Sequence, residues 1–199
     1  MKPHKRRIGI MGGSFNPIHE AHLMIADYIA QRAALDEVWL MVSPMNPLKV
    51  DSQDLAADND RFLMAEIACR RSRRLRASRF EFDLPRPSYT VDTLAALRDA
   101  YPDCEFTLII GSDNWAIFDK WRQADEIKKH HRIVVYPRPG YTVNPATLPQ
   151  GVYLIEAPEL DLSSTFIRNA MAKGIDMNYF LPSGVYDYIK SQGLYKKQQ

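Results

Sequence analysis

The sixteen residues RIGIMGGSFNPIHEAH, at positions 7–22, decide the fold of this chain. The apolar run at residues 7–11 ends at Gly12-Gly13, which predicts a buried strand followed by a tight turn. From residue 19 to residue 34 the apolar residues recur at helical spacing. A strand that passes through glycines into a helix is typical of an α/β sheet, where ligands bind outside the carboxyl ends of the strands.

The rest of the chain repeats this alternation of apolar runs and amphipathic segments. Further strands are predicted at residues 38–42, 80–82, 106–111, 132–136 and 152–155. Further helices are predicted at residues 61–69, from a cap at Ser88 or Thr90, in short segments up to residue 127, from Ser163, and at residues 182–191. This order predicts an α/β fold with a doubly wound parallel sheet in a single domain, residues 1–199. The loops at residues 43–58 and 137–151 are candidate active-site loops.

Composition and charge narrow the class of protein. The chain has 199 residues, of which 46% are hydrophobic and 25% charged, as in globular proteins. Its formal net charge of +2 implies neither a nucleic-acid nor a membrane partner. Cys69 and Cys104 form no CxxC pair, which favours free thiols in a reducing compartment. No secretory signal and no run of about 18 apolar residues occurs, so we expect a cytoplasmic protein.

The first candidate site lies where the first strand passes into the first helix. The backbone at Gly12 and Gly13 can approach a phosphate closely, and the helix N-terminus favours an anion. His19 and His22 share one helical face and could stabilise phosphate charge during a transfer. A tight turn with two surface histidines is the alternative. A metal site of the HxxH type lacks the i,i+4 spacing and a third ligand, so we expect no protein metal ligand.

The second candidate site is the stretch DLSSTFIR at residues 161–168. Ser163, Ser164 and Thr165 stand at a predicted helix start, where hydroxyl groups cap the helix or bind an anion together with its N–H groups. Arg168 lies one turn into the helix and could reach the same anion. Simple capping beside a solvated arginine is the alternative.

The two stretches resemble the signatures of one enzyme superfamily. GGSFNPIHEAH resembles the (H/T)xGH signature of the nucleotidyltransferases, and DLSSTFIR resembles their distal ISSTxIR signature. Their order and separation are similar to those of the bacterial nicotinate-nucleotide adenylyltransferases. Further similarity to that family extends from residue 7 to residue 195 and includes Ser43-Pro44, Asn46-Pro47-Leu48-Lys49, Arg61, PSYTVDTL at 87–94, Gly111-Ser112-Asp113, Trp121, GVYDYI at 184–189 and Gly193-Leu194-Tyr195.

This resemblance implies a fold and a reaction. The fold is Rossmann-like, with a C-terminal helical part from about residue 160 that completes the phosphate site. The reaction transfers AMP from ATP to nicotinate mononucleotide, giving nicotinate adenine dinucleotide and pyrophosphate in NAD biosynthesis. Mg²⁺ would be carried with ATP, because this ion keeps its waters and binds substrate phosphates. The two nucleotides are then the expected partners, and a homo-oligomer is left open.

The resemblance also implies a role for each matched residue. The ATP phosphates are expected to contact His19, His22, Lys49, Ser163, Ser164, Thr165 and Arg168. ATP is also expected to contact Gly12, Gly13, Ser14 and Phe15, and its adenosine or ribose to contact Gly111 and Asp113. The nicotinate is expected to contact Thr90, the Val91 backbone and the ring of Trp121, which suits stacking on a planar ring. For Trp121, simple core packing with Trp115 and Phe118 is the alternative.

The chain departs from the family pattern in several places. Ala21 replaces the usual glycine of the first signature, and the proline often found before Trp121 is missing. Arg122 stands where an aromatic residue is frequent, and we expect it to contact the nicotinate carboxylate. Nicotinamide mononucleotide and phosphopantetheine remain alternative acceptors, and a nucleotide- or RNA-binding module without catalysis remains an alternative class. The arginine-rich run at residues 70–79 is interpreted as the solvated end of a helix rather than a nucleic-acid surface.

Overall fold

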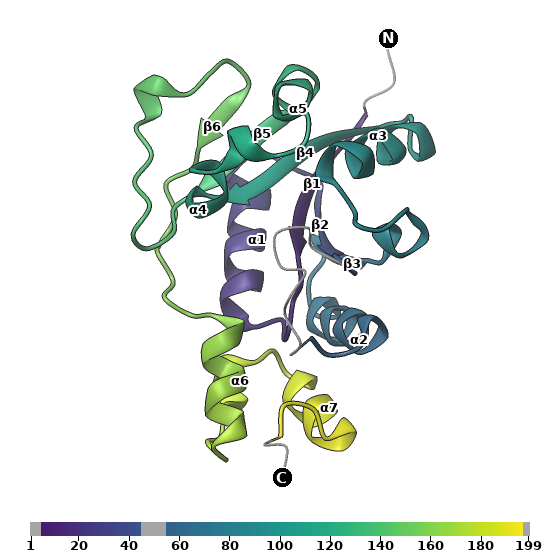
Figure 1. Cartoon of the computed structure of the whole chain (residues 1–199), viewed down its shortest axis with the longest axis vertical. Helices are drawn as coiled ribbons and strands as arrows, with labels where there is room; N and C mark the ends of the chain where they lie inside the picture. Colours follow the sequence, from purple (N-terminus) through teal and green to yellow (C-terminus); the bar gives the residue numbers. More distant parts are fainter. Residues whose placement is uncertain (1–4, 45–54, 197–199) are drawn as a thin grey trace.

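Six parallel strands form one sheet in the computed structural model, which describes residues 5–44 and 55–196 (Figure 1). The strands are β1 (Arg6–Gly13), β2 (Glu37–Val42), β3 (Leu75–Ser78), β4 (Cys104–Gly111), β5 (Arg132–Tyr136) and β6 (Val152–Leu154). Their order across the sheet is β3-β2-β1-β4-β5-β6, and every neighbouring pair is parallel. This Rossmann order confirms the predicted doubly wound α/β fold. It reverses direction between β1 and β4, so the expected ligand crevice lies at the carboxyl ends of these two strands.

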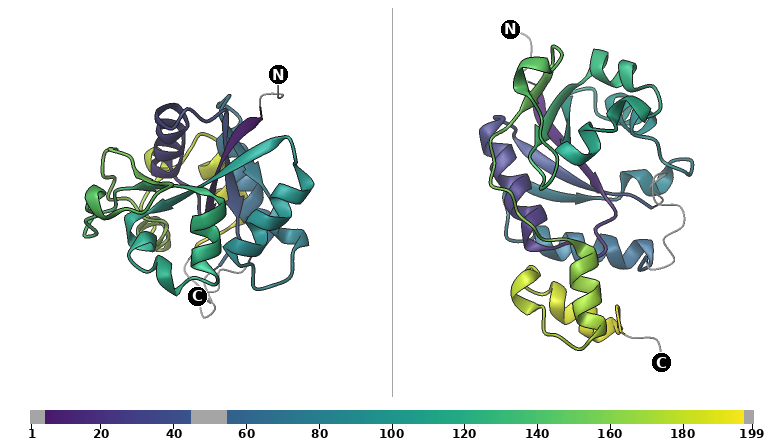
Figure 2. Two further views of the ribbon diagram at one scale, coloured as in Figure 1. Left: turned by 90° about the horizontal axis from the view of Figure 1, so that it is seen from above. Right: turned by 60° about the vertical axis from the view of Figure 1, so that its left-hand side comes forward.

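Helices cover both faces of the sheet, as Figure 2 shows. One face packs against α1 (Glu20–Arg32) and α2 (Asp58–Cys69), and α6 (Ser164–Ala172) and α7 (Val185–Gln192) join the same buried cluster from beyond the end of the sheet. The other packs against α3 (Thr90–Ala100), α5 (Ala124–His130) and the 3-10 helix η3 (Phe118–Lys120). The remaining elements are α4 (Ser112–Trp115) and the 3-10 helices η2 (Phe80–Asp83), η4 (Pro145–Thr147) and η5 (Asn178–Phe180).

Two buried clusters result from this layering. Side chains of a strand alternate between the faces of a sheet. Accordingly, Leu40 of β2 joins the cluster that contains Ile29 of α1, while Met41 joins the cluster that contains Leu94 of α3. All four of these side chains have an exposed fraction of 0%. The strands are therefore buried on both sides, as their continuous apolar sequences predict.

The C-terminal helices lie beyond the carboxyl end of β1. Figure 1 shows α6 and α7 together at the lower end of the molecule, below the start of α1. Ile167 of α6 and Val185 of α7 are fully buried in the same cluster as α1. This packing brings the helix that carries the distal signature to the crevice. Among the residues that the structure describes, no helix is long and apolar enough to cross a membrane.

The predicted strand at residues 80–82 is wrong. These residues form η2, where the Phe82 N–H donates to the Arg79 carbonyl at 2.8 Å. The alternation Phe-Glu-Phe fits a strand, but the neighbouring β3 already supplies the pairing partner of β2, with Leu75 opposite Val38. β3 escaped prediction because only Leu75 of its four residues is buried, as in a short edge strand.

Two further predictions of local structure need correction. The N-cap of α3 is Tyr89, so neither Ser88 nor Thr90 caps this helix. The basic run at residues 70–79 is not the end of a helix, because α2 ends at Cys69 and the run continues through a turn into β3. Within it, Arg76 pairs with Glu37 at 3.8 Å, and Arg79 lies over the ring of Phe82 at 5.3 Å.

Candidate active site

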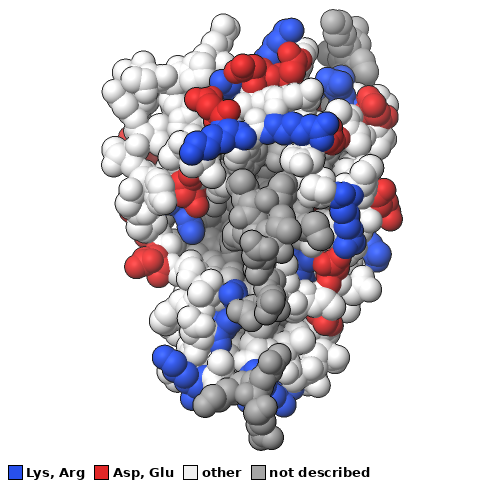
Figure 3. All heavy atoms as spheres, in the orientation of Figure 1, with Lys and Arg blue, Asp and Glu red and all other residues white. Residues whose placement is uncertain are grey.

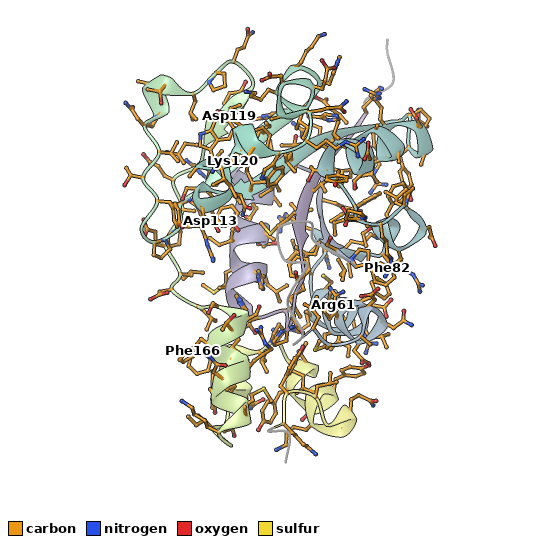
Figure 4. All side chains as sticks on the ribbon, viewed as in Figure 1. Arg61, Phe82, Asp113, Asp119, Lys120 and Phe166 are labelled. Carbon is orange, nitrogen blue, oxygen red and sulfur yellow. The ribbon has the colours of Figure 1, made fainter. Side chains whose placement is uncertain are left out.

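The crevice at the carboxyl ends of β1 and β4 collects most of the described candidate residues. Three segments meet there: the loop from β1 to α1, the start of α6, and the turn from β4 into α4. Figure 4 shows Asp113 after β4 and Arg61 on α2, on either side of β1 in this view. On the face drawn in Figure 3, basic and acidic side chains are interspersed rather than separated by sign.

The β1–α1 loop is held by hydrogen bonds to its carbonyl groups. The Ser43 N–H donates to the Gly13 carbonyl at 2.9 Å, and Arg61 Nη1 donates to the Ser14 carbonyl at 2.7 Å. Within the described residues, the N–H groups of Ser14 and Phe15 donate to no acceptor. Two adjacent unbound N–H groups beside glycine suit an oxyanion.

Phe15 gives this loop an unusual backbone. Its φ is 45°, a left-handed conformation that costs a bulky residue energy and is concentrated at functional sites. The ring is buried, and it lies edge-on to His22 with ring centroids 5.0 Å apart. A Cβ at Gly13 would lie 3.0 Å from this ring, so a larger residue there would press against the Phe15 ring.

The two histidines form a stacked pair at the start of α1. His19 is the N-cap of the helix, and its ring lies 3.7 Å from that of His22, centroid to centroid. The His19 N–H donates to His22 Nδ1 at 3.2 Å, which leaves the proton of a neutral His22 on Nε2. Both rings and the side chain of Arg138 line one hollow.

His19 is a buried, neutral imidazole. Its exposed fraction is 2%, and its Nδ1 has no hydrogen-bond partner in the described parts of the chain. Burial lowers the pKa of His19 from 6.5 to about 3, and the positive charge of Arg138 adds to this effect. At neutral pH His19 is therefore a donor of one N–H rather than a cation.

The start of α6 contacts the β1–α1 loop directly. The Ser163 hydroxyl accepts from the Phe166 N–H at 3.1 Å, which confirms that this serine caps the helix. The Ser164 hydroxyl donates to the Pro17 carbonyl at 2.8 Å. Arg168 Nη1 donates to the Asn16 carbonyl at 2.9 Å, while its Nη2 lies 3.5 Å from the Thr165 hydroxyl. The two signatures thus meet although about 150 residues separate them.

The turn from β4 into α4 brings in a residue that the sequence reasoning missed. Gly111 is the N-cap of α4, and a Cβ on it would collide with the Asp113 carboxylate. The Arg138 N–H donates to the Ser112 hydroxyl at 2.9 Å, so the Arg138 side chain lies between this turn and the histidine pair. Its position directly after β5, in the candidate loop at residues 137–151, was the available signal. A neighbouring cavity of about 220 Å³ is also lined by Arg138, together with Ser112 and Tyr141.

The candidate nicotinate residues gather around the start of α3. Thr90 and Val91 are its first two residues, and no side chain caps its N-terminus. Arg122 lies 4.7 Å from the centre of the Tyr89 ring, and its Nη1 is 3.3 Å from the Asp92 carboxylate. Arg122 is therefore close to the predicted pyridine site but already has an acidic partner.

Trp121 shows features of both interpretations proposed for it. Its ring packs on Phe118 with centroids 5.1 Å apart, which matches the core interpretation. Its buried Nε1 has no hydrogen-bond partner among the described residues, which is unusual for a structural tryptophan.

One of the predicted site residues has no structural position. Lys49 lies outside the described residues. In residues 5–44 and 55–196, no group of three or more His, Cys, Asp or Glu side chains could hold a metal ion.

Comparison with known proteins shows the family to which this chain belongs. Residues 10–170 match the family model described as cytidylyltransferase-like. A protein of Bacteroides thetaiotaomicron, named "probable nicotinate-nucleotide adenylyltransferase", is 50% identical over 94% of this chain and 92% of its own length. A protein of Bacteroides fragilis with the same name is 48% identical over 94% and 93%.

A solved structure shares the fold. It is titled "Plasmodium falciparum nicotinic acid mononucleotide adenylyltransferase complexed with NaAD" and superposes with a TM-score of 0.80. The alignment covers 96% of this chain and 97% of the other at 23% identity. The matched family model and the bacterial relatives place this chain in the cytidylyltransferase-like family, among the nicotinate-nucleotide adenylyltransferases.

Proposed function

We propose that this protein transfers the adenylyl group of ATP to nicotinate mononucleotide, releasing pyrophosphate and forming nicotinate adenine dinucleotide. The meeting of the two signatures carries this proposal, because Ser164 and Arg168 reach the β1–α1 loop beside the stacked histidines. The names of the bacterial relatives support the choice of acceptor.

The reaction needs alignment and charge stabilisation more than a covalent nucleophile. An oxygen of the acceptor 5′-phosphate attacks the α-phosphorus of ATP, a new P–O bond forms, and the bond to the bridging oxygen breaks as pyrophosphate leaves. The attacking oxygen is already anionic, so no general base is required.

Donors around the crevice fit this reaction. The unbound N–H groups of Ser14 and Phe15 can donate to phosphate oxygens as charge develops on them. Neutral His19 supplies an N–H, and the guanidinium groups of Arg138 and Arg168 supply positive charge. Lys49 is proposed to reach the same phosphates, on the family resemblance alone.

Each end of the dinucleotide product has its own group of residues. Gly111 and Asp113 are proposed to bind the ribose of ATP, with the carboxylate accepting from its hydroxyl groups. At the start of α3, the first N–H groups have no intrahelical acceptor, so the Thr90 and Val91 backbone can donate to the nicotinate carboxylate. The Trp121 ring is proposed to stack on the pyridine.

Mg²⁺ is proposed to act as part of the substrate. It would be held mainly by the phosphates and by water, as this ion prefers. Bound with ATP, it would neutralise part of the phosphate charge.

The experiment that tests this function measures pyrophosphate release from ATP and Mg²⁺ with nicotinate mononucleotide or nicotinamide mononucleotide, and without an acceptor as control. Strong preference for the acid supports the proposal, and equal use of both indicates a looser pyridine site. Tight ATP binding without pyrophosphate release for either acceptor would refute the proposed enzymatic activity and favour a nucleotide-binding module. In the same assay, an Arg122→Ala variant with an unchanged acid preference would exclude Arg122 from carboxylate recognition.

A further inference from the structure

The chain returns to the β1–α1 loop after its last helix. Gly193 ends α7 in a left-handed conformation, with φ of 64°, and the Leu194 N–H donates back to the Ile189 carbonyl at 3.0 Å. This turn directs Tyr195 to the crevice, where its hydroxyl donates to Asn16 Oδ1 at 2.7 Å. In Figure 1 the yellow end of the chain lies below the carboxyl end of β1.

This hydrogen bond fixes the middle of the loop. Asn16 has an exposed fraction of only 4%, and its Oδ1 also accepts from the Ala56 N–H at 3.1 Å. An amide oxygen has two lone pairs, so the Tyr195 hydroxyl and the Ala56 N–H occupy both of them. The Asn16 carbonyl accepts separately from Arg168.

Tyr195 is suited to remain a hydrogen-bond donor. Burial raises the pKa of its hydroxyl group well above the usual value, against the opposing charges of Arg168 and Arg61. The hydroxyl therefore stays protonated throughout the physiological range. Removing it would leave a buried acceptor with one partner fewer.

We propose that Tyr195 is a positioning residue for adenylyl transfer, which holds the β1–α1 loop through Asn16 so that the N–H groups of Ser14 and Phe15 face the nucleotide phosphates. This inference rests on the proposed function. In this role Tyr195 acts through Asn16, which directly follows Phe15, and not by contacting ATP or the acceptor. Catalysis is sensitive to such placement, since a shift of ~1 Å can cost roughly a hundredfold in rate.

The chain offers a matched control for a Tyr195→Phe variant. Tyr188 lies in the same C-terminal part, and its hydroxyl donates to Asp60 Oδ1 at the same distance of 2.7 Å. That bond joins α7 to α2 and does not involve the β1–α1 loop. A purely structural role for tyrosine hydroxyl groups in this region predicts equal effects of Tyr195→Phe and Tyr188→Phe.

We expect Tyr195→Phe to lower kcat by roughly ten- to a hundredfold and to leave the KM for nicotinate mononucleotide within about twofold. Tyr188→Phe should change neither value, when both variants are assayed well below their melting temperatures. In an Asn16→Ala background, Tyr195→Phe should have almost no further effect on kcat, because both changes remove the same bond. A kcat of Tyr195→Phe within twofold of the wild type, an equal loss in Tyr188→Phe, or additive losses with Asn16→Ala would overturn the proposal.

A second measurement separates this inference from the proposed function. Binding of α,β-methylene-ATP by calorimetry requires no acceptor and no turnover. We expect Tyr195→Phe to weaken this binding several-fold and Tyr188→Phe to leave it unchanged. If the wild type proves inactive with every pyridine nucleotide, this pattern still supports the role of Tyr195 at the loop, and equal binding by both variants refutes it.

Discussion

Replacing Arg61 by methionine should destabilise the protein severely, because this buried side chain donates hydrogen bonds to several segments. Its exposed fraction is 0%. Nε donates to the Ala56 carbonyl at 3.0 Å, and Nη1 donates to the carbonyls of Ser14 and Ser43 at 2.7 and 2.8 Å. Nη2 completes an ion pair with Asp58 at 2.5 Å.

The magnitude follows from the groups that lose their donor. Each net hydrogen bond contributes ~1 kcal/mol, and an unpaired buried acceptor costs ~1–3 kcal/mol. The lost ion pair adds less than the ~3–5 kcal/mol of a fully buried pair, because the Asp58 side chain is 28% exposed and still has Arg86 as a partner. We therefore expect Arg61→Met to lower the free energy of unfolding by about 3–5 kcal/mol, which corresponds to a fall in Tm of roughly 6–20 °C for a chain of this size.

Urea unfolding monitored by tryptophan fluorescence measures this change, with an unaltered m-value as the check on two-state behaviour. Arg86→Met is the matched control. Arg86 pairs with the other oxygen of the same carboxylate, Asp58 Oδ2 at 3.0 Å, but its side chain is 46% exposed. Exposed pairs contribute at most ~1 kcal/mol, so this variant should be nearly as stable as the wild type. A loss below 1 kcal/mol in Arg61→Met, or equal losses in both variants, would refute the reasoning.

Two further predictions concern the two signatures. The pKa of His19 is depressed from 6.5 to about 3 in the folded protein. Between these two pH values the imidazole is protonated in the unfolded chain but neutral in the folded one, so acid favours unfolding. The contribution of His19 to the free energy of unfolding is therefore complete above pH 6.5 and is lost as the pH falls toward 3. This loss should amount to at most about 4–5 kcal/mol, and an NMR titration of His19 with a midpoint near 6.5 would contradict it. Ser163→Ala removes the cap of α6 and should cost ~1 kcal/mol of unfolding free energy; an unchanged urea midpoint would show that the cap contributes nothing.

The sequence predicts the interior of the sheet well and its edge poorly. β1, β2, β4, β5 and β6 lie within two residues of the predicted strands, because apolar runs buried on both faces have a strong local signal. β3 has one buried residue in an arginine-rich run, and its pairing with β2 decides its conformation. The pair Phe80 and Phe82 shows the opposite case, in which a two-residue period occurs without a strand.

The candidate site residues also differ in how well the sequence predicts them. His19, His22 and Ser163 could be found because their spacing within one helix or at its start carries the signal. Arg138 and Tyr195 could not be assigned a role in the same way. Their proposed roles rest on contacts between segments far apart in the chain, which local periodicity does not encode.

The hydrogen bonds of the β1–α1 loop link the two signatures to the binding of an anion. Every backbone group near the interior needs a partner. The carbonyls of Ser14, Asn16 and Pro17 receive donors from α2 and α6, whereas the N–H groups of Ser14 and Phe15 meet no acceptor in the described residues. These three carbonyls thus have donors while the two N–H groups have no acceptor, and a group rich in acceptors, such as a phosphate, suits the two N–H groups. Under the proposed function, the distal signature would therefore contribute to phosphate binding even where its side chains contact the loop, because those contacts leave the N–H groups for the anion.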